Sequence, residues 1–367
     1  MIKSLIFSFI ALAFTATNYA QKTIPLDTIN WDIEADGYLF ETYKGQPSIY
    51  LQGGSMTLKD VTFLNGTIEY DIQLKDERGF PGIYFRLNGS NGEQFYVRPH
   101  QRGNPDANQA TGLINGISPW QFYFGKKYSF PYKYNFKDWT HVKLVIKNRK
   151  AQVFLDHAKE PNNSWELFHE PKSGKIRLTG GMNHGVHIAN IKIDHSEPVL
   201  ENFNPGERKP LENLIPEWEI SDKFEESNLS DPVNLSSILA KRKWGKSISV
   251  EEGVAANISR EVELRNNVPG NTVFARITIT SDKDQTKLFE FGYSDRVVAY
   301  LNSQPIYKGN NRFQSRDYRY LGTIGLFDAI YLNLKKGKNT LLLAVSEDFG
   351  GWLVTGRFSD SSGLKIK

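Results

Sequence analysis

The stretch Thr67-Ile-Glu-Tyr-Asp-Ile72 alternates polar and apolar side chains. A period of two places successive side chains on opposite faces of a β-strand, whereas a helix shows a period near 3.6. Similar short runs, bounded by Gly, Asn and Asp, recur at 48–51, 82–87, 142–146, 151–155 and 188–193. Many short strands with turns between them and no amphipathic helix predict a β-sandwich.

A second set of alternating runs lies toward the C-terminus, at 261–264, 271–280, 287–291, 296–301, 329–334, 340–345 and 352–358. The segment between the sets, 196–246, is irregular, but it contains Leu211, Leu214, Ile215 and Trp218, so we expect it to pack in places. Residues 235–243 predict one short helix. A chain of 367 residues is long enough for two cores. We predict an all-β fold of two β-sandwich (jelly-roll) domains, 21–195 and 247–367, joined by a structured connector.

The N-terminus has the features of a secretory signal. Lys3 supplies a positive start, residues 5–14 are apolar, and a cut near Ala20 would remove residues 1–20. The apolar run is too short to span a bilayer. The chain has no cysteine, so its stability rests on core burial and not on disulfides. We therefore expect a periplasmic or secreted protein that does not span the membrane.

Charge and aromatic content narrow the class of partner. The net charge is only +4 and both signs are interspersed, so nothing indicates nucleic acid or a membrane surface as a partner. The aromatic share of 13% suits both strands and sugar-binding surfaces.

Residues 95–123 combine many hydrogen-bonding side chains with aromatic rings. Amides and charges beside flat apolar rings are what a pocket needs to bind a hydroxyl-rich ligand such as a sugar. We predict that this stretch is a short strand followed by a long binding loop. The predicted hydroxyl ligands are Arg98, His100, Asp106, Gln109 and Asn115, and the predicted stacking ring is Trp120.

Several stretches of the first half resemble a known family. They are Phe63-Leu-Asn-Gly-Thr-Ile-Glu-Tyr-Asp-Ile72, Gly82-Ile-Tyr-Phe-Arg86, Phe136-Lys-Asp-Trp-Thr-His-Val-Lys-Leu-Val-Ile146 and Ala151-Gln-Val-Phe-Leu-Asp156. Residues 40–195 resemble the concanavalin A-like lectin/glucanase superfamily, which includes laminin G-like domains. The resemblance implies a β-sandwich, and it leaves carbohydrate binding, glycan cleavage and protein interaction open because the fold hosts all three.

The resemblance also allows a test for catalysis. Retaining glucanases of this superfamily carry Glu-x-Asp-x-x-Glu or Glu-x-Asp-x-Glu on one strand, with the acids on one face as nucleophile and acid/base. Here Glu69 and Asp71 are present, but Gln73 or Leu74 stands where the second Glu belongs. We expect the two acids to face solvent on an ordinary strand. Glu69, Asp71 and Asp106 remain the candidate acids of the alternative, a glycoside hydrolase-like enzyme.

No metal or cofactor site is predicted from the sequence. His184 and His187 lie three residues apart in a Gly-rich turn, but no His-Glu-x-x-His or comparable ligand set accompanies them. Calcium bound by carboxylates is an open alternative, although no Asp-x-Asp-x-Asp loop marks it.

The second half resembles a galactose-binding-like jelly roll, through Phe291-Gly-Tyr-Ser-Asp-Arg-Val-Val-Ala-Tyr-Leu-Asn302 and Leu332-Asn-Leu-Lys-Lys-Gly-Lys-Asn-Thr-Leu-Leu-Leu-Ala-Val345. One interpretation is that Arg316, Asp317, Tyr318 and Trp352 line a ligand edge. The other is that the two charged residues form ion pairs while the aromatics close the core. Gly350 and Gly351 predict a close turn that brings Trp352 against a neighbour.

Together these observations predict a secreted, non-catalytic carbohydrate-binding protein. A glycan-processing enzyme and a protein-interaction module are the alternatives.

Overall fold

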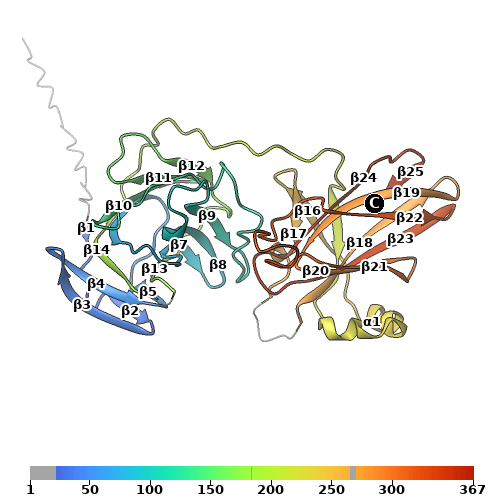
Figure 1. The fold of residues 1–367 in the computed structure, drawn as a ribbon, viewed down its shortest axis with the longest axis horizontal. Coiled ribbons are helices and arrows are strands. Elements are labelled where there is room, and N and C mark those ends of the chain that lie inside the picture. Colours follow the sequence, from blue (N-terminus) through green and yellow to red (C-terminus); the bar gives the residue numbers. More distant parts are fainter. Residues whose placement is uncertain (1–21, 183, 265–269) are drawn as a thin grey trace, which may run out of the picture.

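The computed structural model describes residues 22–182, 184–264 and 270–367, and within them the chain is built almost entirely of antiparallel strands (Figure 1). The all-β fold class is therefore confirmed. The predicted signal, residues 1–20, lies outside the described residues. Within the described part of the chain, no helix is long and apolar enough to cross a membrane.

The first sandwich consists of two sheets. The larger sheet has the order β12-β11-β10-β6-β14-β4-β3, with β1 added to β14, and the smaller sheet has the order β2-β5-β13-β7-β8-β9. The strands of the larger sheet are β1 (Lys22–Thr23), β3 (Gly37–Tyr43), β4 (Gln46–Gln52), β6 (Gly66–Gln73), β10 (Thr140–Lys147), β11 (Lys150–Leu155), β12 (Asn163–Glu166) and β14 (Val186–Asp194). Those of the smaller sheet are β2 (Trp31–Glu34), β5 (Ser55–Leu58), β7 (Gly82–Asn88), β8 (Asn91–Val97), β9 (Asn108–Leu113) and β13 (Lys175–Thr179).

The alternation in β6 decides which of its faces is buried. Ile68, Tyr70 and Ile72 point between the sheets and join the apolar core. Glu69 and Asp71 point away from the core and stay partly exposed. The two acids were expected to face solvent; they do lie on the outer face of the strand, but their side chains are only 17% and 13% exposed.

The second sandwich is a single sheet that folds over itself, in the order β21-β20-β23-β18-β15-β16-β17-β24-β19-β22, with β25 added to β18. Its strands are β15 (Glu217–Ile220), β16 (Lys246–Glu251), β17 (Ala255–Asn257), β18 (Thr272–Ser281), β19 (Gln285–Ser294), β20 (Arg296–Leu301), β21 (Gln304–Asn310), β22 (Asp328–Leu334), β23 (Gly337–Ser346), β24 (Leu353–Phe358) and β25 (Leu364–Ile366). β16 joins the layers, because it pairs with β15 up to Ser249 and with β17 from Val250 onward.

The predicted elements around the connector differ from the structure in two places. The connector was predicted to run to residue 246, but β15 already belongs to the second sheet and α1 (Leu235–Ala240) packs beside it, with Leu235 and Ile238 in one cluster with Phe274. Apolar burial therefore incorporates the second half of this segment into the second sandwich. The predicted strand at 261–264 is wrong, because these residues follow the 3-10 turn η4 (Ile258–Arg260) without joining a sheet. The predicted helix at 235–243 is confirmed as α1, but it ends at Ala240, three residues earlier than predicted.

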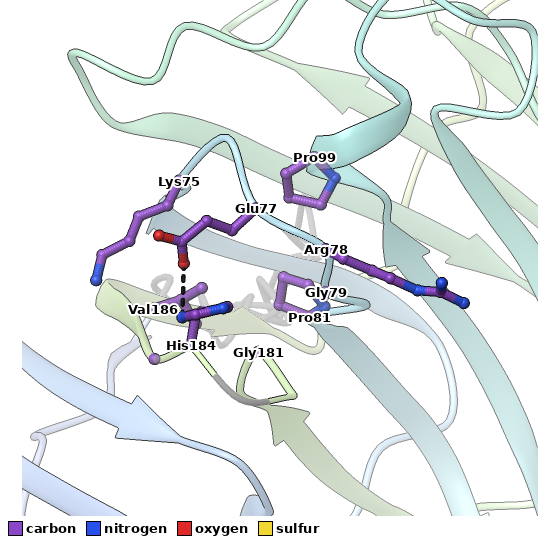
Figure 2. Close-up of a pocket in the computed structure, with 10 residues that line it drawn as sticks. Lys75, Glu77, Arg78, Gly79, Pro81, Pro99, Gly181, His184 and Val186 are labelled. Carbon is purple, nitrogen blue, oxygen red and sulfur yellow. Dashed lines mark ion pairs between the residues drawn. The ribbon is translucent and has the colours of Figure 1, made fainter.

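A turn at one end of the first sandwich encloses a small pocket (Figure 2). Residues after β6, including Glu77 and Arg78, face Gly181 and His184 from the segment between β13 and β14. The pocket holds about 10 Å³, which is room for roughly one water molecule. It is too small for a sugar ring.

Gln121 connects the two sandwiches. Its backbone N–H donates to the Gly350 carbonyl (3.1 Å) and its carbonyl accepts from Ile324 N–H (3.2 Å). Its side-chain Nε2 donates to the Leu321 carbonyl (2.9 Å), and its Oε1 accepts from Ser294 Oγ (2.9 Å). The residue is completely buried. Every one of these partners belongs to the second sandwich, so the first sandwich inserts a fully bonded polar residue into the second.

Two glycines of the second sandwich, Gly322 and Gly350, leave room for the Gln121 side chain. A Cβ on Gly322 would lie 2.3 Å from Gln121 Nε2, and a Cβ on Gly350 would lie 2.4 Å from its amide carbon. Both glycines have positive φ, at +72° and +112°. The prediction of a close turn at Gly350 and Gly351 is confirmed, and Gln121 is the side chain that the turn contacts.

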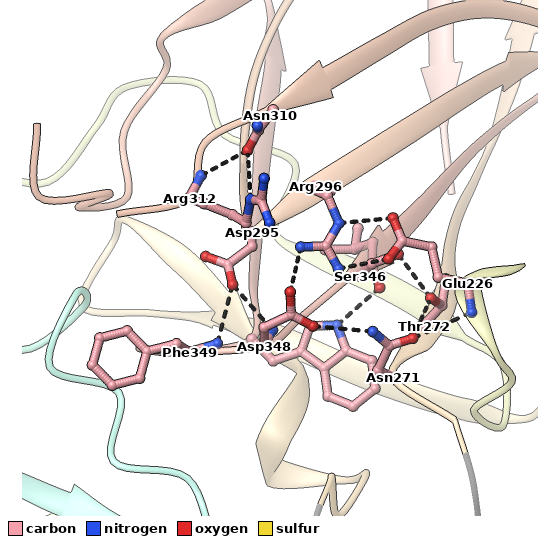
Figure 3. Close-up of polar contacts among 12 residues, drawn as sticks. Glu226, Asn271, Thr272, Asp295, Arg296, Asn310, Arg312, Ser346, Asp348 and Phe349 are labelled. Carbon is pink, nitrogen blue, oxygen red and sulfur yellow. Dashed lines mark hydrogen bonds and ion pairs between the residues drawn. The ribbon is translucent and has the colours of Figure 1, made fainter. Parts of the chain in front are cut away.

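Two buried carboxylates belong to residues next to this contact, since Asp295 follows Ser294 and Glu347 bonds to Gly351. Figure 3 shows Asp295 with Asp348 and Phe349. Asp295 accepts hydrogen bonds from the backbone N–H of Asp348 and of Phe349, both at 3.0 Å. Glu347 Oε1 accepts from Gly351 N–H (3.0 Å), whereas its Oε2 is buried without a partner among the described residues. Burial raises the pKa of Glu347 well above its usual value, and the negative charge of Asp295 raises it further. Burial likewise raises the pKa of Asp295.

We expect Gln121→Leu to lower the free energy of unfolding by about 2–4 kcal/mol, because the buried hydroxyl of Ser294 and the partly buried carbonyl of Leu321 each lose a bond that costs roughly 1–3 kcal/mol to leave unmade. Chemical denaturation measures the change. Gln101→Leu in the same segment is the matched control, because the Gln101 side chain only accepts an exposed bond from Asn104. Equal stability of the two variants would contradict the structural role of Gln121.

The raised pKa of Glu347 predicts that the free energy of unfolding depends on pH. A carboxyl whose pKa is raised on folding holds a proton that the unfolded chain releases, so stability falls as pH rises from about 4.3 through the folded pKa. The slope contributed by one such group approaches about 1.4 kcal/mol per pH unit in that window. We expect Glu347→Gln to flatten this decline, as measured by thermal unfolding at a series of pH values. Glu217→Gln on an exposed strand position is the control, and a variant curve parallel to the wild type would contradict the assignment.

Candidate functional site

Arg98 was predicted to bond a ligand, but its side chain has hydrogen-bond partners inside the protein. It is 9% exposed; its Nη2 donates to Tyr96 Oη (3.0 Å) and contacts Gln109 Oε1, and its Nη1 pairs with Asp106 Oδ2 (3.1 Å). Gln109 is 1% exposed and donates from Nε2 to the Trp120 carbonyl (2.9 Å). Three of the predicted hydroxyl ligands, Arg98, Asp106 and Gln109, therefore satisfy one another. The segment predicted as a long loop also contains strand β9, which pairs Gln109 with Tyr96.

The remaining ligands predicted in this segment have structural contacts too. His100 lies edge-on to Phe80, with ring centroids 5.3 Å apart. Burial lowers the pKa of His100, and the nearby Arg78 and Arg98 lower it further. Asn115 donates from Nδ2 to the Ser259 carbonyl of the second sandwich (2.7 Å). His100 therefore packs on the first sandwich, and Asn115 bonds across to the second.

Trp120 was predicted to stack on a sugar ring. It packs instead against two rings of the second sandwich, with centroids 6.1 Å from Phe313 and 5.7 Å from Phe349. Aromatic side chains at this contact bury apolar area between the two sandwiches. The structure thus places the second half of the predicted binding loop at the interface between the sandwiches.

The charged residues predicted at a ligand edge of the second sandwich form ion pairs. Arg316 pairs with Asp328 (2.7 Å) and Asp317 pairs with Arg319 (3.0 Å). Tyr318 is 76% exposed. These three residues lie on the surface. In the described part of the chain, no contact brings their side chains together around one cavity.

Trp352 does not line any edge. Its side chain is completely buried, and its Nε1 donates to the Val345 carbonyl (3.0 Å). The interpretation in which this aromatic closes the core is the one that the structure supports.

The two histidines considered as metal ligands have different partners. His184 Nδ1 pairs with Glu77 (2.9 Å), as Figure 2 shows, and His187 Nε2 pairs with Glu41 (3.0 Å). In the described residues, no group of three or more His, Cys, Asp or Glu side chains could hold a metal ion.

The outer face of β6 brings together polar groups from three neighbouring strands. Asp71 Oδ1 accepts from His141 Nδ1 of β10 (2.7 Å), and Asp71 Oδ2 accepts from Asn190 Nδ2 of β14 (2.7 Å). His141 Nε2 lies 3.6 Å from Glu69 Oε2. The side chains of Asp71 and Glu69 are only 13% and 17% exposed to solvent, and both lie on the outer face of β6. We call Glu69, Asp71, His141 and Asn190 the β6 face.

Two aromatic rings lie next to the β6 face. Tyr43, at the end of β3, stacks on His187 with centroids 3.7 Å apart and an interplanar angle of 8°. Trp139, just before β10, lies edge-on to Tyr43 at 6.1 Å. Both rings are only partly buried. The register of the sheet places His187 opposite Gln73 and His141 opposite Asp71, so rings and carboxylates share one side of the sheet.

The pKa of Asp71 shows how this face is charged. Burial raises the pKa, but the hydrogen bonds from His141 and Asn190 and the positive potential of His141 and His157 outweigh burial, so the pKa lies below its usual value. Asp71 is therefore an ionised acceptor. The ring of His157 stacks on His141 at 4.0 Å.

Gln73 stands where the glucanase pattern requires an acid. Its Nε2 donates to the carbonyls of Leu74 (2.9 Å) and Phe136 (2.8 Å), and its Oε1 accepts from Lys44 Nζ (2.6 Å). The side chain is buried and its amide is fully bonded. Asp106, the third candidate acid, pairs with Arg98 and not with Glu69 or Asp71.

No role was predicted from the sequence for Tyr43, Trp139, His141 or Asn190. The pattern Trp139-Thr-His-Val-Lys143 does alternate, so one face of this strand was predictable. The pairing of β10 and β14 with β6 was not, since His141 and Asn190 lie 70 and 119 residues from Asp71.

No protein-family model and no curated protein matches this chain. Among solved structures, the carbohydrate-binding module CBM66 from Bacillus subtilis is similar at 15% identity, over 45% of this chain and 96% of that chain, with a TM-score of 0.35. The β-glucanase of Bacillus licheniformis is similar at 10% identity, over 47% of this chain and 96% of that chain, with a TM-score of 0.34. A family 35 carbohydrate-binding module from an environmental isolate is similar at 12% identity, over 26% of this chain and 72% of that chain, with a TM-score of 0.20. Carbohydrate-binding modules and glucanases are thus both among the structures that resemble parts of this chain.

Proposed function

We propose that the protein binds carbohydrate without cleaving it, and that the β6 face is its glycan-binding surface. One observation carries this proposal: the ionised carboxylate of Asp71 and the partly exposed rings of Tyr43 and Trp139 lie on the same side of one sheet, through the pairing of His141 with Asp71 and of His187 with Gln73. A carboxylate and an amide take sugar hydroxyls, and a flat ring covers the C–H face of the sugar. Asn190 supplies the amide, already oriented by its bonds to Gln46 (2.6 Å) and Asp71.

The chemistry of the face favours binding over hydrolysis. A glycosidase acid must be protonated near neutral pH, which requires a raised pKa. The pKa of Asp71 is lowered instead, because its two hydrogen-bond donors stabilise the carboxylate. Gln73 cannot supply the second carboxyl group, and its amide is held by three internal bonds.

We also propose that the protein acts outside the cytoplasm, in the periplasm or after release. The support is the signal-like sequence, with Lys3 ahead of the apolar run 5–14. Free and polymeric glycans are ligands that an exported binding protein meets.

A glycan array tests the proposal, followed by calorimetry with the ligands that bind. We expect Asp71→Asn to weaken binding about 10- to 100-fold, because hydrogen bonds to a charged group are worth roughly 1.5–3 kcal/mol. We expect Trp139→Ala to weaken it about 3- to 10-fold through loss of ring contact.

Two matched controls test whether the loss of glycan binding is specific to the β6 face. Asp317→Asn and Tyr331→Ala change exposed residues of the second sandwich, and we expect both to bind as the wild type does. Absence of binding at millimolar glycan would refute the proposal. Release of reducing sugar from a polysaccharide by the wild type, lost in Asp71→Asn, would show instead that the β6 face is an active site.

A further inference from the structure

One turn of the second sandwich contacts two neighbouring residues of the first. This segment, 347–351, follows β23, and we call it the 347–351 turn. Its Gly350 carbonyl accepts from Gln121 N–H (3.1 Å). The ring of its Phe349 lies 5.7 Å from the ring of Trp120. A displacement of this turn would therefore break both contacts.

Two acidic side chains hold this turn in place. Asp295 is 1% exposed and accepts from the backbone N–H of Asp348 and of Phe349, as Figure 3 shows. Glu347 is also 1% exposed, and its Oε1 accepts from Gly351 N–H (3.0 Å). Three backbone N–H groups of one turn are thus bonded to two carboxyl groups in the interior, so the position of the turn depends on these carboxyl groups.

The groups around Glu347 do not compensate a negative charge on it. Its Oε2 is buried without a partner among the described residues. The charged side chains that act on it are Asp295, Asp348 and Arg296. Arg296 already pairs with Asp348 and with Glu226, both at 2.5 Å. Three acidic groups therefore share one cation before Glu347 is counted.

The loop after β21 brings two more titratable groups to this cluster. Arg312 acts on Asp348, and Tyr320 interacts with the charge of Asp295. Arg312 is exposed and donates to Asn310 Oδ1 (3.3 Å). Burial raises the pKa of Tyr320, which keeps its hydroxyl neutral. Neither group supplies a buried positive charge to the turn.

The protonation state of Glu347 therefore affects the turn that carries it. Burial raises the pKa of Glu347, and the charge of Asp295 raises it further, so the folded chain holds this proton at a pH where an ordinary glutamate has released it. A buried neutral carboxyl is far less costly than a buried unpaired carboxylate. The route to water is short, because Phe349, two residues along the turn, is 56% exposed.

We propose that the 347–351 turn is a pH-sensitive contact between the two sandwiches. When Glu347 loses its proton, the turn moves toward solvent to hydrate the carboxylate, and it releases Gln121 and Trp120. Both sandwiches stay folded, and the contact forms again when the pH falls.

Bonds that do not involve the turn keep the sandwiches joined after it has moved. Tyr123 Oη of the first sandwich donates to Glu251 of the second (2.8 Å). Lys127 of the first pairs with Glu252 of the second (2.6 Å). A rise in pH does not remove the carboxylates that these bonds use. The expected change is therefore local to the turn and is not a separation of the two sandwiches.

The seven tryptophans provide a local measurement. In protein labelled with 5-fluorotryptophan, ¹⁹F NMR reports each indole ring separately, and Trp120→Phe identifies the Trp120 signal. We expect this signal to shift reversibly between about pH 5 and pH 9, above the usual range of a glutamate. The signals of Trp31 and Trp165, which lie in the core of the first sandwich, should stay in place. This titration requires no substitution at the turn itself.

Substitutions then assign the transition to Glu347. Glu347→Gln keeps the shape of the side chain and an acceptor for the turn but cannot ionise, so we expect its Trp120 signal to be independent of pH. Asp295→Asn removes one neighbouring negative charge, and we expect the transition to shift to lower pH. Glu217→Gln, at an exposed position of β15, is the matched control and should titrate as the wild type does.

Three results would overturn the proposal. In the first, the Trp120 signal of the wild type is constant over this pH range. In the second, it moves only together with the signals of Trp31 and Trp165, which is global unfolding. In the third, Glu347→Gln titrates as the wild type does.

Discussion

The two sandwiches are held together by polar bonds across their contact, and those of the Gln121 amide come from a completely buried residue. Gln121 comes from the first sandwich, yet Leu321, Ile324, Gly350 and Ser294 of the second sandwich satisfy its polar groups. A buried amide that loses such partners is costly, so the first sandwich has one favourable orientation against the second. The surrounding contacts, such as Trp120 with its two phenylalanines, add apolar area around a position that the amide has already fixed.

The same constraint accounts for the polar and aromatic composition of residues 95–123 without any ligand. Charged and amide side chains beside aromatic rings are needed by a sugar pocket, and they are needed equally by an interface that must bury polar groups. Arg98 bonds to Gln109 within the first sandwich, while Asn115 and Gln121 donate to carbonyls of the second sandwich. Composition identifies groups that require a partner, but it does not say whether the partner is a ligand or another part of the same chain.

The strands were predictable because alternation is a local property. It placed Ile68, Tyr70 and Ile72 inside and Glu69 and Asp71 outside, as observed. The candidate site was less predictable because its parts meet only through long-range pairing. His141 reaches Asp71 through the register of β10 against β6, and Asn190 reaches it at a bulge in β14. The broken acid pattern at Gln73 was visible in the sequence, whereas the internal bonds that occupy Gln73 were not.

The second sandwich also holds two segments of the first through the short turn η4. Arg260, at the end of η4, donates from Nη1 to the carbonyl of Phe168 (2.8 Å). Asn115 bonds both to Asn91 of the first sandwich and to the Ser259 carbonyl of η4. One short turn of the second sandwich thus fixes two segments of the first that are distant in sequence. Burial raises the energetic importance of such bonds, since a shift of η4 would leave Arg260 and Asn115 without their carbonyl partners. In this arrangement the second sandwich braces the first, and the glycan-binding surface that we propose lies on the first.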